Sequence, residues 1–217
     1  MAKIISVKEA MEMIHDEMSI MIGGFLAVGT PEILVDALVE KNTKNHTLIA
    51  ISTAYPNKGS GKLVVNKQVK KAIVSHIGTN PEAGKQYING ELEIEFVPQG
   101  TLVERIRCGG FGMGGFLTPT GVGTEIEEGK QRMTIDGKDY LLEKHLRADI
   151  AFIRAHKADK NGNLTYRKAA RNSNIVMATA ADITFVVADE IVEVGELDQD
   201  EIMTPGIFVN YLVNFLF

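Results

Sequence analysis

The stretch DEMSIMIGGFLAVGTP, residues 16–31, carries the strongest indication of the fold. The apolar run at residues 20–22 predicts a short strand that stops at Gly23-Gly24. Pro31 is typical of the first position of a helix, and Thr30 would cap that helix. A glycine-rich turn from a strand into a helix lets backbone N–H groups approach a bound anion closely. The segment therefore predicts both a strand-helix unit and a backbone-lined pocket for an anionic ligand.

Short apolar runs alternate with helical stretches over residues 1–107. The pattern predicts strands at residues 20–22, 47–51, 72–75 and 94–97, and helices at 32–38 and near the N-terminus, where Val7, Ala10, Met11 and Ile14 share one face. This rhythm indicates an α/β fold with a single open, mostly parallel sheet and helices on both faces. Turns rich in Gly, Pro, Asn or Ser follow the strands, and we expect them to line one crevice at the carboxyl ends.

A second glycine-rich segment, CGGFGMGGFLTPTGVG, occupies residues 108–123. Its glycine density favours a loop over a helix or strand. Asp136-Gly137 lies between two apolar runs and predicts a β-hairpin. A strand at 149–154, a helix near 169–181 and a strand at 183–187 then resume the α/β rhythm. We therefore expect one domain over residues 1–217, with a Gly-rich loop and hairpin inserted at 108–145.

Composition narrows the class of protein. The chain has 217 residues, 45% of them apolar, and a net charge of −5 with scattered Lys and Arg, which argues against a nucleic-acid surface. The single cysteine, Cys108, excludes an intrachain disulfide and favours a reducing compartment. The first residues do not resemble a secretory signal, and the apolar tail at 207–217 is shorter than the roughly 20 residues of a membrane span. We expect a cytoplasmic protein whose tail packs in the core or an interface.

No single motif assigns a function. The spacing of Gly23, Gly24 and Gly29 matches neither the dinucleotide pattern G-x-G-x-x-G nor a P-loop. Taken alone, this loop fits a ligand-free turn as well as a binding site. His76 and His156 have no further ligand at a suitable spacing, so we expect no metal site.

Several segments together resemble the α-subunit of the family I coenzyme A transferases. After residues 16–31, the matching segments are SHIGTNPE from Ser75, VPQGTLVERIRCGG from Val97, GGFLTPTGVGT from Gly114 and RADIAFIRAHKAD from Arg147. They cover almost the full length and are most similar to acetate or butyrate-acetoacetate transferases. Glu17 stands where the family usually has Gly or Asn, so we expect a changed turn before the first signature strand.

The resemblance implies half of an enzyme. In this family a glutamate of the β-subunit, within Ser-Glu-Asn-Gly, attacks the acyl-CoA thioester and carries CoA as a glutamyl thioester in a ping-pong cycle. This chain lacks that tetrapeptide, and Glu125, Glu127 and Glu128 look like a solvated hairpin edge. We therefore expect no catalytic residue here and no cofactor, since CoA thioesters are substrates. The expected partner is the β-subunit, in a complex of two α and two β chains.

The resemblance also implies contact residues. Those for CoA are Gly23, Gly24, Phe25, Leu26, Ala27, Val28 and Gly29, and those for the acyl group are Gln99, Gly100, Gly114 and Gly115. Gln99 would donate a hydrogen bond to an acyl carboxylate without quenching the glutamate. Residues 109–115 would form a flexible wall. Three plainer interpretations remain open: packing alone for residues 23–29, a turn residue for Gln99, and a surface loop for 109–115.

Two other functions remain open on such a fold. One is a non-catalytic domain that senses an acyl-CoA or a sugar phosphate, which predicts ligand affinity without turnover. The other is a sugar-phosphate isomerase, which needs its own base. The absence of a carboxylate directly after a predicted strand counts against the isomerase.

Overall fold

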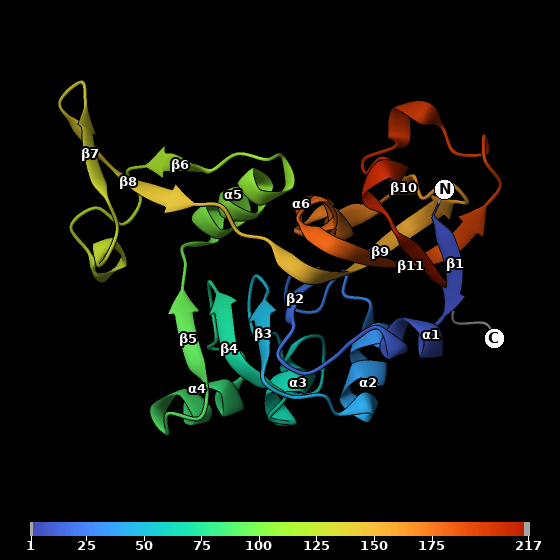
Figure 1. Cartoon of the computed structure of the whole chain (residues 1–217), viewed down its shortest axis with the longest axis horizontal. Helices are drawn as coiled ribbons and strands as arrows, with labels where there is room; N and C mark the ends of the chain where they lie inside the picture. The colour runs from blue at the N-terminus through green and yellow to red at the C-terminus, as the bar shows by residue number, and fades with distance from the viewer. Residues whose placement is uncertain (1, 215–217) are drawn as a thin grey trace.

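The computed structural model describes residues 2–214, which form two β-sheets with helices packed around the larger one (Figure 1). The nine-stranded sheet contains β1 (Lys3–Ser6), β2 (Ser19–Ile22), β3 (His46–Ile49), β4 (Val69–Val74), β5 (Glu93–Phe96), β9 (Ala148–Asp159), β10 (Leu164–Thr165), β11 (Ala181–Val192) and β12 (Tyr211–Asn214). Eight strands run parallel in the order β1-β12-β11-β9-β2-β3-β4-β5, and β10 pairs antiparallel with β9. The open, mostly parallel sheet is confirmed.

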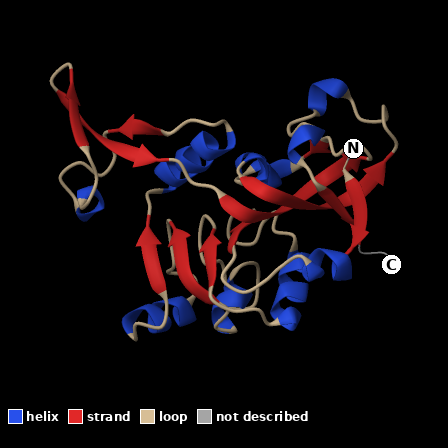
Figure 2. Ribbon diagram, in the orientation of Figure 1, coloured by secondary structure: helices blue, strands red, loops and turns tan. Residues whose placement is uncertain are grey.

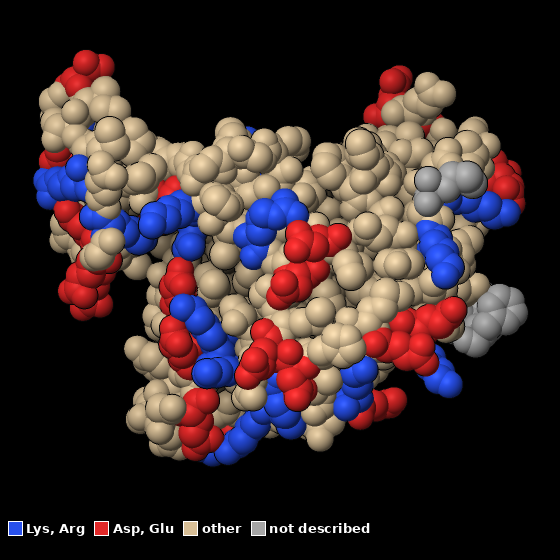
Figure 3. Space-filling model, viewed as in Figure 1, with Lys and Arg blue, Asp and Glu red and all other residues tan. Residues whose placement is uncertain are grey.

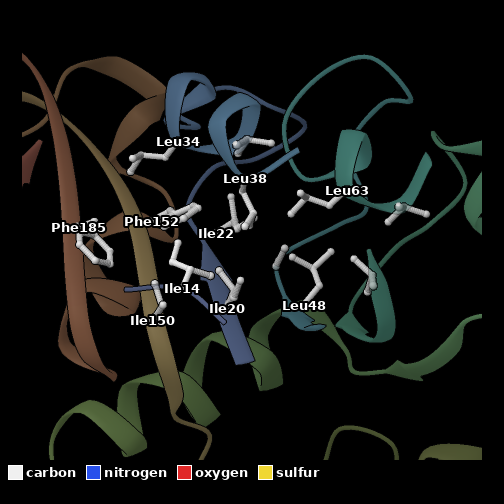
Figure 4. Close-up of a cluster of buried hydrophobic side chains, with 14 of the residues drawn as sticks. Ile14, Ile20, Ile22, Leu34, Leu38, Leu48, Leu63, Ile150, Phe152 and Phe185 are labelled. Atoms are coloured by element: carbon white, nitrogen blue, oxygen red, sulfur yellow. The ribbon is translucent and has the colours of Figure 1, made fainter. Parts of the chain in front are cut away.

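Helices cover both faces of this sheet (Figure 2). One face carries α1 (Val7–Glu12), α2 (Glu32–Lys41), α3 (Gly61–Val65) and α4 (Pro81–Ile88), and the other carries α5 (Gln99–Gly110) and α6 (Asn174–Thr179). Successive strand residues point to opposite faces. Ile20 and Ile22 therefore join the cluster with Leu34 (Figure 4), whereas Met21 joins the cluster with Leu102 on the other face.

The N-terminus differs from the sequence-based expectation. Strand β1 precedes the expected helix and pairs with β12 near the other end of the chain. The helix begins only at Val7, where the Ser6 hydroxyl accepts from the Glu9 N–H and the Glu9 carboxylate accepts from the Ser6 N–H. In the tail, Leu212 and Val213 of β12 are buried, as expected for a core segment, and residues 215–217 lie outside the described residues.

The loop expected at residues 108–123 is wrong at its start and in its middle, whereas residues 119–123 form turns as expected. Helix α5 continues to Gly110, and β6 (Gly115–Thr118) pairs with β8 (Lys138–Lys144). The helix tolerates these glycines because other segments pack directly on them. A Cβ on Gly109 would lie 2.2 Å from Leu146 O, and one on Gly110 would lie 1.9 Å from Thr179 Oγ1.

The predicted hairpin is confirmed. Strands β7 (Arg132–Ile135) and β8 are joined by Asp136 and Gly137, whose φ angles of 51° and 75° are those of a type I′ turn. The sheet β6-β8-β7 projects away from the large sheet (Figure 1). The segment expected at a hairpin edge instead contains a 3₁₀ turn, η1 (Glu125–Glu127), ahead of β7.

The expected strands at 149–154 and 183–187 lie within the longer β9 and β11. The helix expected near 169–181 is shorter, because η2 (Lys168–Arg171) and an irregular Asn172 precede α6. Two more 3₁₀ turns, η3 (Gln199–Glu201) and η4 (Gly206–Phe208), follow β11. Within residues 2–214, every helix is too short or too polar to cross a lipid bilayer.

Candidate functional site

The strand order of the large sheet reverses between β2 and β9. Strands β3, β4 and β5 are added in chain order on one side of β2, whereas β9, β11 and β12 are added in chain order on its other side. In open α/β sheets, the crevice beyond the carboxyl ends at such a switch point is the usual ligand site. Residues 23–31 leave β2 at this point, and the Gly23 N–H donates to Phe152 O of β9 across 3.0 Å. The glycine-rich turn predicted within residues 16–31 thus lies at the switch point.

The tip of this loop is a tight turn with an exposed end. Phe25 and Val28 exchange backbone hydrogen bonds of 3.0 and 2.9 Å, and between them Leu26 and Ala27 have φ angles of 47° and 71°. These are type I′ turn angles, which Asn and Gly adopt more easily than Leu and Ala. Among the described residues, the N–H groups of Leu26 and Ala27 have no hydrogen-bond partner. The tip therefore presents two free donors on a strained backbone.

The glycines of the loop lie beneath this tip and are buried. A Cβ on Gly23 would lie 1.9 Å from Asn174 Oδ1, and one on Gly29 would lie 2.9 Å from the Ala170 Cα. Gly24 has a φ of 126°, which side-chain-bearing residues rarely adopt. The three glycines thus allow close packing, while residues 25–28 supply the exposed surface.

A clamp of three residues holds the loop, and the sequence analysis did not identify it. Asn174 Nδ2 donates to Gly29 O at 2.9 Å, and Asn174 Oδ1 accepts from the Arg154 N–H at 3.1 Å. Asn172 Nδ2 donates to Val28 O at 2.9 Å, and the Ser173 hydroxyl lies 3.2 Å from both the N and the O of Gly24. The only sequence signal for this clamp is the run Asn-Ser-Asn inside a predicted helix, where such side chains often bond to backbone groups.

The expected Thr30 cap is wrong. The Thr30 hydroxyl donates to Gly23 O at 3.0 Å, and Pro31 occupies the N-cap position without a side-chain hydrogen bond to the helix. The first turn also contains Glu32, whose carboxylate accepts from the Gly59 N–H at 2.8 Å. Glu32 thus places a carboxylate of the chain itself in the first turn of α2, which disfavours an anion there, although the Ile33 N–H forms no hydrogen bond within residues 2–214.

Of the four turns expected to line one crevice, those after β2 and β3 share a pocket of about 500 Å³, whereas the turn after β5 lines a different one. The shared pocket is lined by Leu26, Ala27, Tyr55 and Lys62, among others. Burial lowers the pKa of Lys62, but the Asp36 and Glu32 carboxylates, 2.5 and 2.6 Å away, outweigh it and hold this pKa above its usual value. Lys62 is therefore a charged group whose charge is already compensated.

Gln99 and Gly100 form the first turn of α5 directly after Pro98 and are exposed. They line a cavity of about 390 Å³ with Phe116 and Thr118 of β6. Gly114 and Gly115 are outside its lining: a Cβ on Gly115 would lie 2.3 Å from Glu143 O, so that glycine serves the pairing of β6 with β8. The structure thus brings together two of the four residues expected around the acyl group.

The Gln99 cavity and the loop at residues 23–29 are separate parts of one edge. Two strands lie between β2 and β5, so these parts are about 14 Å apart at the usual strand spacing. The intervening turns are bonded together, since the Thr79 hydroxyl donates to Ala54 O at 2.6 Å. A ligand that reaches both parts must be long.

The remaining candidate groups are accounted for by packing. Cys108 is fully buried in α5. His156 Nδ1 lies 3.4 Å from Asp189 Oδ2, beside the pair formed by Arg154 and that aspartate. Across residues 2–214, no three His, Cys, Asp or Glu side chains gather in a group that could hold a metal ion. On the face seen in Figure 3, the described Lys and Arg side chains are interspersed with Asp and Glu and form no continuous basic stripe.

A family model described as coenzyme A transferase matches residues 4–214. The chain belongs to this family. It is 56% identical over 211 residues to the protein named acetate CoA-transferase subunit alpha of Escherichia coli (strain K12), covering 97% of this chain and 96% of the relative. It is 50% identical over 212 residues to the acetoacetyl-CoA:acetate/butyrate CoA transferase alpha subunit of Clostridium acetobutylicum, covering 98% and 97%.

Solved CoA-transferase structures share the fold. An acyl-CoA transferase of E. coli O157:H7, in a thioester complex with CoA, superposes with a TM-score of 0.85 at 22% identity. That match covers 98% of this chain and 49% of the other, so this chain spans about half its length. Glutaconate coenzyme A-transferase from Acidaminococcus fermentans gives a TM-score of 0.82 at 18% identity, covering 98% of this chain and 75% of the other. The expected CoA-transferase fold is confirmed.

Proposed function

We propose that this chain is the α-subunit of a heteromeric, cytoplasmic CoA-transferase acting on short-chain acyl groups. It moves CoA between an acyl-CoA, such as acetoacetyl-CoA, butyryl-CoA or acetyl-CoA, and a carboxylate such as acetate. The observation that carries the proposal is the near full-length similarity, at 56% and 50% identity, to two alpha subunits named for these reactions. The sensor and isomerase interpretations have no observation of this structure in their favour.

The arrangement of the carboxyl edge fits a long thioester substrate. The free N–H groups of Leu26 and Ala27 would contact CoA at the switch point. The Gln99 side chain, about 14 Å along the edge, would meet the acyl end. A neutral amide donor there orients an acyl carboxylate and leaves a nearby glutamate nucleophile ionised. The glycines at 23, 24 and 29 would then act indirectly, because their lack of a side chain lets the loop pack closely against the residues beneath it.

The nucleophile would come from the partner. The carboxylates beside the loop are already engaged, since Glu32 pairs with Lys62 and Asp189 pairs with Arg154. The chain also matches only about half of the longer transferase of E. coli O157:H7, which leaves a second half for another subunit to supply. We propose a β-subunit with the reactive glutamate in that role, in a complex of two α and two β chains.

The test of the proposal is an assay of acetoacetyl-CoA with acetate. The purified chain is assayed alone and after co-expression with the proposed β-subunit. We expect transfer only from the complex. Full activity from the single chain would refute the two-subunit claim, and a stable complex without CoA transfer from any short-chain acyl-CoA would refute the proposed reaction.

A pair of variants tests the placement of CoA. Val28, at the loop tip, is 52% exposed, so Val28→Asp adds a negative charge with little effect on packing. We expect a several-fold rise of the KM for acetoacetyl-CoA through repulsion of its phosphates. Val65→Asp is the matched control, because Val65 is 39% exposed at the end of α3, by the amino edge of the sheet. Equal kinetics for the two variants would remove the loop tip from the CoA site.

A further inference from the structure

Three cations in the segment Arg167-Lys168-Ala169-Ala170-Arg171 have no partner within the described chain. Arg167, Lys168 and Arg171 are exposed, and among residues 2–214 their side chains form no ion pair or hydrogen bond. Of the other cations near the loop, Lys62 is compensated by two carboxylates and Arg154 by Asp189, whereas Lys58 is exposed and likewise forms no ion pair within residues 2–214. In a chain with a net charge of −5, this is a local excess of positive charge.

Two of these cations lie in the pocket at the switch point. Arg167 and Lys168 line a pocket of about 400 Å³ together with Val28 and Gly29 of the loop. The hydrogen bond from Asn172 Nδ2 to Val28 O, 2.9 Å long, ties the basic segment to the loop tip. The basic segment is thus held beside Val28, the residue that follows the free N–H of Ala27.

The backbone of Lys168 is strained where it meets this pocket. Its φ of 52° is left-handed, a conformation that disfavours a residue with a Cβ. Within residues 2–214, the Lys168 side chain forms no hydrogen bond or ion pair that would offset this strain. Strain of this kind is concentrated at ligand sites.

The charge of the pocket favours an anion with several negative charges. Asp189 is the only carboxylate among its lining residues, and Arg154 Nη2 donates to it at 2.9 Å. The charges of Arg167 and Lys168 remain uncompensated, next to backbone N–H groups that also favour an anion. A short-chain carboxylate has one charge, whereas coenzyme A has a diphosphate and a 3′-phosphate.

We propose that Arg167 and Lys168 bind the phosphate groups of the coenzyme A substrate in the switch-point pocket. This proposal rests on the proposed function. It also gives the substrate a direction along the sheet edge. The phosphates lie beside residues 154–156 of β9 and Asp189 of β11, the loop tip covers the middle, and the acyl group lies at Gln99 beyond β5.

The experiment compares substrates with and without phosphates. The double variant Arg167→Gln/Lys168→Gln is prepared in complex with the β-subunit and assayed with acetoacetyl-CoA and with acetoacetyl-pantetheine. We expect kcat/KM for acetoacetyl-CoA to fall about tenfold or more, as for the loss of charge-assisted contacts, and kcat/KM for the pantetheine thioester to stay unchanged. The fall should shrink as salt is added, because the lost interaction is screened.

Two further variants make the test specific. Lys8→Gln/Lys70→Gln removes the same charge from exposed, unpaired positions in α1 and β4, and we expect wild-type kinetics from it. Lys168→Gly removes one cation and relieves the left-handed strain, so it should raise thermal stability while lowering kcat/KM for acetoacetyl-CoA severalfold. This variant keeps the test valid if the double variant folds poorly.

Three results would overturn the proposal. They are unchanged kinetics with acetoacetyl-CoA, an equal loss with both thioesters, and failure of the double variant to associate with the β-subunit, which would make the segment an interface. Absence of CoA transfer from the wild-type complex would instead refute the proposed function, and the two failures are therefore distinct.

Discussion

The contact between Gly23 and Asn174 gives the sharpest test of how the loop is held. Gly23→Ala places a methyl group 1.9 Å from Asn174 Oδ1 and 2.6 Å from Asn174 Cγ. Since no left-handed φ is required at Gly23, any penalty comes from this overlap. Asn174→Ala removes the overlapping atoms, so the two substitutions together should be better tolerated than their separate effects suggest.

The magnitudes follow from the hydrogen bonds involved. Asn174 is fully buried, and its loss leaves Gly29 O and the Arg154 N–H without partners. At about 1–3 kcal/mol for each of these two groups, Asn174→Ala should lower the free energy of unfolding by about 2–6 kcal/mol. Gly23→Ala should lower it by a similar amount, about 2–4 kcal/mol, by displacing the same side chain. The double variant should resemble Asn174→Ala alone, a coupling of about 2–4 kcal/mol.

Urea unfolding of the four proteins under identical conditions measures this coupling. The control cycle pairs Gly23→Ala with Asn89→Ala, because Asn89 is exposed and its amide bonds only to Glu91 at 3.3 Å. That cycle should be additive within about 0.5 kcal/mol. Additive effects for Gly23 and Asn174 would refute the clamp.

Three further predictions concern stability. Glu17 has a φ of 68°, so Glu17→Gly should raise the free energy of unfolding by about 1 kcal/mol. Glu12→Gly, at the end of α1, should instead lower it. Urea unfolding of both variants should therefore give changes in stability of opposite sign. Burial lowers the pKa of His46, and the hydrogen bond to Met18 O offsets this effect only in part. The folded chain therefore binds a proton at His46 less tightly than the unfolded chain does, in which the pKa of this residue is near 6.5. Stability should be complete above that pH and decline below it, and His46→Gln should flatten the decline in melting temperature; an unchanged slope would contradict the assignment. Gly109→Ala should destabilise by at least about 1 kcal/mol against Leu146 O, while Gly84→Ala, with nothing within 4 Å, should stabilise α4; the same sign for both would contradict the packing account.

Local sequence patterns were sufficient to predict the elements whose conformation depends mainly on neighbouring residues. The strands β2 to β5 follow short apolar runs ended by turn residues, and Asp136-Gly137 supplies the left-handed residues of a hairpin turn. Glu17 is a different case: it adopts the left-handed conformation for which Gly or Asn is the ordinary choice, so its effect is strain at that turn.

The errors arose where distant segments meet. Strand β1 depends on β12 at the other end of the chain, which no periodicity within residues 3–6 reveals. The glycines at 109 and 110 resemble a loop in sequence, yet Leu146 and Thr179 pack directly on them within a helix. Tertiary contacts override local propensity in both places.

The residues of the candidate site likewise fall into those predicted from the sequence and those seen only in the structure. The loop at 23–29 and the pair Gln99-Gly100 were placed at the sheet edge from sequence, and their roles in binding stay predictions. The clamp of residues 172–174 and the free cations at 167 and 168 were missed, because their significance depends on a loop about 145 residues earlier in the chain. A match of ordered segments identified the family, while only the structure shows which side chains surround the loop.

In the proposed enzyme this chain binds the substrate, while its partner carries the reactive glutamate. Borohydride trapping of the complex with acetoacetyl-CoA, followed by intact-mass measurement of both chains, shows which chain reacts. We expect a mass change on the β-subunit alone and none on this chain. A covalent adduct on this chain would contradict this assignment.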